Sequence, residues 1–131
     1  MSPLSRSIAG PMLSFNLAEE LAIVRADDSY RRSGRAGRTL AKQGPVRLTL
    51  VALAEGVEVG THHAESPITV QPLEGRIRFR AQGQERELRA GEVLYFGPGH
   101  AQGIRAEEET ALLLTLTACE GEGDGVREGE A

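Results

Sequence analysis

The stretches GVEVGTHHAESPITVQPLEG, residues 56–75, and GEVLYFGPGHAQGIRA, residues 91–106, decide the fold of this chain. Each begins with a glycine and contains short runs of β-branched, aliphatic or aromatic residues. Glycine and proline interrupt these runs every few residues, which is typical of short strands joined by tight turns. The two stretches therefore predict an all-β structure.

The spacing of these glycines and of one histidine resembles the two signature motifs of the cupin superfamily. Gly56, His62 and Gly75 match the first motif, and Gly91 and Gly99 match the second. The resemblance covers residues 46–117 and is strongest to compact bacterial single-domain cupins. It implies an antiparallel jelly-roll β-barrel, and the sequence adds a short N-terminal helix.

The resemblance also implies four metal ligands that converge inside the barrel, of which this sequence supplies His62. The other three positions hold Ala64, Ile68 and Gln102. An aliphatic side chain cannot bind a cation, and a neutral amide oxygen is a poor ligand for a transition metal. We therefore expect no resident cofactor, although a divalent transition metal could bind weakly to His62 and His100.

The candidate ligand-binding residues are His62, His100, Gln102 and Tyr95. Adjacent residues of a strand point to opposite faces, so only one of His62 and His63 can face a cavity, and the sequence leaves open which one. Gln102 could satisfy one ring nitrogen of a cavity histidine. A proton-transfer enzyme could instead use His62 with Tyr95.

Two functions remain open at this point. The first is that of a small protein that binds a small molecule in the barrel cavity without a full metal site. The sequence favours this function, and with it a protein that is not an enzyme. The alternative is a metal-dependent enzyme of the isomerase or dioxygenase type that uses His62 and His100. The apolar run at residues 111–114 also predicts assembly into a homodimer.

Composition narrows the possible partners. The chain has 131 residues and a net charge of -4, which gives no electrostatic reason to expect nucleic acid or an anionic membrane as a partner. No apolar stretch is long enough to cross a bilayer, and the N-terminus lacks the pattern of a secretory signal, so a cytoplasmic location is expected. The single cysteine, Cys119, cannot form an internal disulfide.

Four segments are predicted along the chain: a flexible arm over 1–13, a helix and connector packing on the barrel over 14–45, the barrel over 46–118, and a disordered acidic tail over 119–131. Asn16 followed by Glu19 predicts a capped helix over about residues 17–26. The arginine-rich residues 29–38 favour a solvated connector over a phosphate-binding arm.

The strand predictions begin with residues 46–54, an apolar run that indicates burial on both faces. Pro72 places the strand at 68–73 at an edge or a bulge. Residues 76–80 alternate arginine with Ile77 and Phe79, and a turn at residues 82–83 would place Arg80 opposite Glu85 and Arg78 opposite Glu87 as cross-strand ion pairs. Residues 92–96, 102–106 and 111–117 complete the predicted strands.

Overall fold

The computed structural model describes residues 8–60, 62–64, 66–97 and 99–117, and over residues 62–64 and 100–102 it is the backbone that is described. The predicted tail at 119–131, Cys119 and residues 1–7 of the predicted arm lie outside these ranges. The elements are α1 (Leu17–Arg25), α2 (Asp28–Ser33), β1 (Arg35–Gln43), β2 (Val46–Leu53), β3 (Glu58–Val59), β4 (His62–Ala64), β5 (Ile68–Glu74), β6 (Arg76–Ala81), β7 (Gln84–Arg89), β8 (Leu94–Phe96), β9 (Gly99–Ala106) and β10 (Thr110–Thr117).

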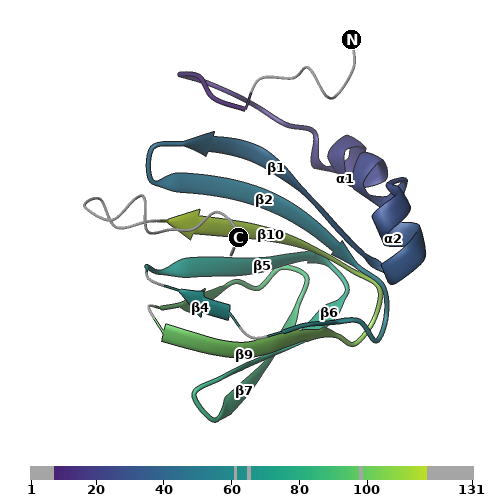
Figure 1. The fold of residues 1–131 in the computed structure, drawn as a ribbon, viewed down its shortest axis with the longest axis vertical. Coiled ribbons are helices and arrows are strands. Elements are labelled where there is room, and N and C mark those ends of the chain that lie inside the picture. The colour runs from purple at the N-terminus through teal and green to yellow at the C-terminus, as the bar shows by residue number, and fades with distance from the viewer. Residues whose placement is uncertain (1–7, 61, 65, 98, 118–131) are drawn as a thin grey trace.

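Within the described residues the strands form two antiparallel sheets (Figure 1). Sheet A has the order β1-β2-β10-β5-β8, and sheet B has the order β3-β9-β6-β7 with β4 also paired to β9. Side chains from both sheets meet in one hydrophobic cluster, so the main core lies between them. An antiparallel all-β fold with a short N-terminal helix is thereby confirmed, whereas closure of the sheets into a jelly-roll barrel remains a prediction.

Strand β2 separates two cores. Leu53 is fully buried in the core between the sheets, whereas Leu50 and Ala52 are fully buried in a second core on the outer face of sheet A. Because side chains alternate along a strand, this division follows directly from the apolar run of the sequence. The predicted strand with two buried faces is confirmed.

Helix α1 covers the outer face of sheet A (Figure 1). The Asn16 Oδ1 accepts a hydrogen bond from the backbone N–H of Glu19 at 3.0 Å, which confirms the predicted N-cap. Leu21 and Val24 then pack against the core that contains Leu50. None of the helices in the described ranges has the length and apolar character needed to cross a membrane.

A partly buried ion pair joins α1 to strand β1. The Arg38 Nε lies 2.7 Å from the Glu20 Oε1, and the two side chains are only 15% and 11% exposed. Removing one member of such a pair leaves the other charge poorly solvated. This pair therefore holds the helix at a fixed place on the sheet.

Residues 29–38 differ from the predicted solvated connector, because they form α2 and the start of β1. The Asp27 Oδ1 accepts hydrogen bonds from the Ser29 backbone N–H at 2.8 Å and the Ser29 hydroxyl at 2.9 Å, which lower the pKa of the Asp27 carboxyl. Gly34, with φ of 77°, ends the helix. Few apolar side chains of β1 are buried. The sequence of this strand therefore has no clear hydrophobic alternation from which the strand could be predicted.

The predicted hairpin register is confirmed. Arg80 pairs with Glu85 and Arg78 with Glu87 across β6 and β7, and Gln82 and Gly83 form the turn with φ of 54° and 76°. Positive φ at both turn residues suits the right-handed twist of the strands.

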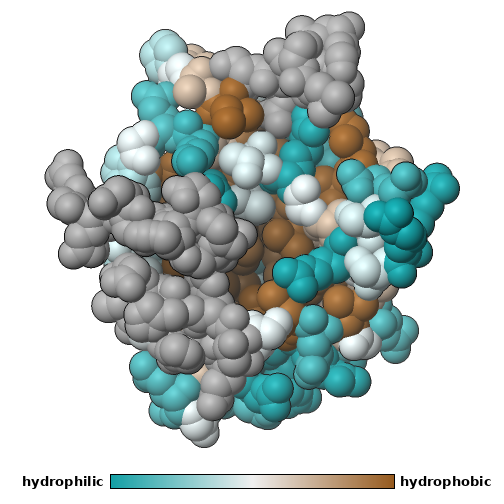
Figure 2. All heavy atoms as spheres, in the orientation of Figure 1, coloured by the Kyte–Doolittle hydropathy of each residue, from teal (hydrophilic) through white to brown (hydrophobic). Residues whose placement is uncertain are grey.

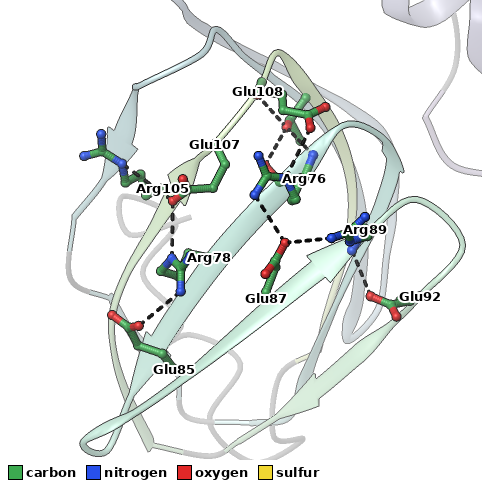
Figure 3. Close-up of polar contacts among 10 residues, drawn as sticks. Arg76, Arg78, Glu85, Glu87, Arg89, Glu92, Arg105, Glu107 and Glu108 are labelled. Carbon is green, nitrogen blue, oxygen red and sulfur yellow. Dashed lines mark hydrogen bonds and ion pairs between the residues drawn. The ribbon is translucent and has the colours of Figure 1, made fainter.

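The ion pairs on this hairpin, however, differ from the predicted directly opposite pairs. They run diagonally, with Arg78 Nη1 3.4 Å from Glu85 and Arg76 Nη1 3.3 Å from Glu87 (Figure 3). Long side chains on a twisted ribbon reach diagonal neighbours as readily as opposite ones. From the β9 side, Glu107 and Glu108 pair with Arg78 and Arg76.

Pro72 lies at a bulge, as predicted. It pairs with Leu112, whereas Ala111 pairs with Glu74, so Leu73 is the extra residue between the two pairs. Strand β8 pairs only with residues 68–70 of β5, so proline interrupts no strand pairing on that side.

The glycines of both sequence motifs have backbone conformations that favour glycine. All four have positive φ: Gly56 at 87°, Gly75 at 85°, Gly91 at 95° and Gly99 at 150°. At Gly75 the space is also closed, because a Cβ there would collide with the Glu109 carbonyl and the Thr110 side chain. At Gly91 a Cβ would meet nothing within 4 Å.

We predict that Gly75→Ala lowers the free energy of unfolding by about 3 kcal/mol or more, since left-handed backbone strain adds to a steric collision. Gly91→Ala is the matched control, with similar φ but open space, and should cost about 1 kcal/mol. Denaturant unfolding followed by circular dichroism measures both. Equal losses in the two variants would contradict the close approach at Gly75.

We also predict that Glu20→Gln lowers the free energy of unfolding by about 1–3 kcal/mol, because it removes the charge of Glu20 from a partly buried ion pair with the Arg38 guanidinium. Glu19→Gln, the same change at the exposed neighbouring position, should cost no more than about 0.5 kcal/mol. Thermal and denaturant unfolding compare the two variants, and a Glu20→Gln variant as stable as Glu19→Gln would count against the role given to this pair.

Candidate functional site

A cavity of about 510 Å³ lies between sheets A and B. Figure 2 shows hydrophobic side chains within a hollow on one face of the molecule, framed by more polar residues. The volume falls in the range of cavities that hold small organic molecules. This cavity is the candidate functional site.

Aliphatic and aromatic side chains make up most of the cavity wall. Alternate residues of β10 and β5 contribute from sheet A, and β3, β6 and β9 contribute from sheet B: Leu112, Leu114, Leu116, Ile68 and Val70, with Val59, Phe79 and Ile104. These residues also contact the main hydrophobic cluster, where the Phe79 and Phe96 rings lie 5.5 Å apart. The core therefore continues into an apolar wall suited to an apolar ligand.

One side of the cavity is polar, and it is formed by β1 and β2. Arg47, Thr49 and Val51 are alternate residues of β2 that line the cavity, and Thr39 lies opposite Thr49 on β1. The Thr49 Oγ1 is shielded from solvent and has no hydrogen-bond partner within the described part of the chain. A buried hydroxyl without a partner is unusual and indicates a group that a ligand could satisfy.

Two arginines that line the cavity, Arg35 and Arg47, have no side-chain ion pair with any described residue. Arg35 is exposed, whereas Arg47 is partly buried. They lie at opposite ends of the cavity. Arg35 pairs with Leu53 of β2, and Leu53 is six residues from Arg47 along β2, a separation of about 20 Å.

The structure places the predicted histidines on two paired strands. His62 of β4 pairs with Ala101, and His63 pairs with His100 of β9. Ala101 in turn pairs with Ala81 of β6, a buried residue of the main core. The side chains of these histidines are outside what is described, so their part in a ligand site remains a prediction.

Gln102 and Tyr95 are placed differently. Ala101 and Gly103 pair with adjacent residues of β6, so Gln102 is the extra residue of a bulge in β9. Tyr95 of β8 is 69% exposed and is not one of the described residues that line the cavity. The structure thus does not bring Tyr95 to the cavity wall with the other described residues.

The residues present do not fit a full cupin metal site. Ile68, at the position that the resemblance gives to a carboxylate ligand, is 8% exposed, lines the cavity and packs in the apolar core. Ala64 has no donor atom. Among the residues whose side chains are described, which do not include the three histidines, no three cysteine, aspartate or glutamate side chains come together as metal ligands.

Sequence reasoning missed the polar wall, and the signal for it was available. Arg47 and Thr49 are the polar residues at alternate positions within an apolar run, so they share one face of the strand. The prediction that residues 46–54 are buried on both faces did not distinguish the face that carries Arg47 and Thr49 from the apolar face. Arg35 was missed because β1 was not predicted.

The fold is similar to that of several solved proteins. A conserved protein of unknown function from Streptococcus pyogenes aligns with a TM-score of 0.63 and 21% identity over 68% of this chain and 78% of that one. A cupin superfamily protein from Desulfitobacterium hafniense aligns with a TM-score of 0.62 and 18% identity, covering 65% of this chain and 78% of its own.

A larger protein also contains this fold. Salicylate 1,2-dioxygenase from Pseudoaminobacter salicylatoxidans aligns with a TM-score of 0.72 and 15% identity over 86% of this chain, which spans 37% of the dioxygenase. No protein-family model and no curated protein sequence matches the chain. At these identities the similarity concerns architecture, and the chain has the cupin fold.

Proposed function

We propose that this protein binds a small organic molecule in the cavity between its two sheets, which close into a jelly-roll barrel, and that it does so without a full metal site. The observation that carries the proposal is the cavity of about 510 Å³, with an apolar wall and a polar side where the Thr49 hydroxyl has no partner among the described residues. A ligand there would bury its apolar surface and meet a few placed polar groups, as small-molecule sites require. Homodimer formation and a cytoplasmic location remain predictions from the sequence.

An enzyme that uses a metal ion is the second candidate. It is supported by the similarity in fold to salicylate 1,2-dioxygenase and by the pairing of β4 with β9, which places the His62 and His63 strand beside the His100 strand. Ile68 and Ala64 count against it, because neither can donate to a metal at the positions that the motif provides. For this reason small-molecule binding is the proposed function.

We predict that the neutral fluorescent probe N-phenyl-1-naphthylamine binds in the cavity with enhanced emission. Its apolar rings would move out of water and pack against the apolar wall that contains Leu114. Leu114→Trp should fill part of the cavity and weaken binding by about tenfold or more. Fluorescence titration measures the dissociation constant.

The matched control is Leu113→Trp. Leu113 is next to Leu114 on β10 but faces the outer core beneath α1, so the change should leave probe binding within about threefold. Circular dichroism confirms that each variant is folded. Equal probe binding by the Leu114→Trp and Leu113→Trp variants, or no binding by the unaltered protein, would overturn the proposal.

We predict that protein purified without an affinity tag contains less than about 0.1 transition-metal ion per chain by elemental analysis, because two of the four motif positions have no donor atom. The same protein should keep its unfolding temperature after dialysis against a chelator. A stoichiometric metal that is lost in His62→Ala but retained in His63→Ala would favour the metal-dependent enzyme instead.

A further inference from the structure

We propose that the ligand of this cavity is an apolar organic anion, with one carboxylate or similar acidic group, and that Arg47 and Thr49 bind the acidic group at one end of the cavity. The inference rests on the proposed function, since it concerns the same cavity. It adds the charge of the ligand and the direction in which the ligand lies.

The first support is the exceptional state of Arg47. Five described arginines are partly buried, and four of them form ion pairs with glutamates: Arg25, Arg38, Arg76 and Arg78. Arg47 is the fifth, and it has no ion pair or hydrogen bond to a described residue. A partly buried guanidinium that lines a cavity and has no counter-charge among the described residues is suited to an anion from outside the chain.

The surroundings of Arg47 support the same conclusion. Its partner across the strand pair with β10 is Leu116, which lines the cavity, so the guanidinium stem runs beside apolar surface. Water solvates a charge less well beside such a wall, which strengthens the attraction for an anion that enters. The planar guanidinium can also donate two parallel hydrogen bonds to a carboxylate.

Thr49 supplies the second group. It lies two residues from Arg47 on the same face of β2, about 7 Å along the strand, and both residues line the cavity. Its hydroxyl is shielded and has no partner among the described residues. Rotation about the Cα–Cβ bond would exchange the hydroxyl with the methyl group and present a donor to an anion held by Arg47.

The rest of the cavity fits the body of the ligand. From the Arg47 end, Leu116, Leu114 and Leu112 follow one another along β10, and Val70 and Phe79 face the same space from the other strands. A molecule with its acidic group at Arg47 would lay an apolar chain or ring system along this wall. Arg35, at the far end, is exposed and therefore already solvated.

The test uses the full chain loaded with N-phenyl-1-naphthylamine, which is displaced either by octanoate or by octan-1-ol. The two competitors share the same length of carbon chain and differ in the charge of the head group. Octanoate should displace the probe at a concentration about tenfold or more lower than octan-1-ol, because a charge-assisted hydrogen bond to Arg47 adds to the apolar contact.

Variants locate the anion site. Arg47→Gln should raise the competing concentration of octanoate by about tenfold or more, whereas that of octan-1-ol should change by less than about threefold. Arg47→Lys keeps the charge without the planar fork and should give an intermediate loss. Thr49→Val, of almost the same shape, should weaken octanoate by about three- to tenfold.

Arg35→Gln is the matched control, because it removes the same charge from the other end of the same cavity. It should change the displacement by octanoate less than about threefold. Circular dichroism and direct probe titration establish that every variant folds and still binds the neutral probe.

The outcomes separate the two proposals. If the unaltered protein does not bind the probe, the proposed function fails and the inference fails with it. If the probe binds but octanoate is no better than octan-1-ol, the cavity binds neutral molecules and only the inference is overturned. It is overturned equally if Arg35→Gln weakens octanoate as much as Arg47→Gln does.

Discussion

The alternation of side chains along β2 is the constraint on which the rest of the structure depends. The strand lies between β1 and β10 in sheet A, so each of its side chains must enter either the core beneath α1 or the space between the sheets. Leu50 and Ala52 take the helix side, and Leu53 takes the other. A shift of one residue in its pairing would exchange Thr49 and Arg47 with the apolar residues of the helix-covered core.

This constraint explains why the polar groups of the cavity come from one edge of sheet A. Strands β5 and β10 are central in their sheet, and their inward residues pack against sheet B. β1 is the edge strand of sheet A, so no further strand of the sheet lies beyond it. Polar residues such as Arg35 and Thr39 are therefore tolerated on its inward face. The cavity is therefore apolar where the two sheets meet and polar towards the edge at β1.

Local rules predicted those parts of the fold that depend on neighbouring residues. Asn16 and Glu19 identify a helix start because capping involves residues three apart, and Gln82 and Gly83 determine the register of Arg78 with Glu87 because two-residue turns allow few backbone conformations. The sequence did not predict the diagonal ion pairs, the strand β1 or the polar side of the cavity wall. Each depends on residues brought together by the twist and pairing of the sheets, which the sequence pattern does not contain.

The charge of the cavity also bears on the choice between a cation site and an anion site. Arg47 has no ion pair with a described residue, and a metal cation held in the same cavity would be repelled by its like charge. Ile68, at the position that the resemblance gives to a carboxylate ligand, supplies no negative charge that could offset either cation. A cavity that keeps Arg47 and lacks that carboxylate has a net positive lining among the described residues, which favours an anionic ligand over a metal cation.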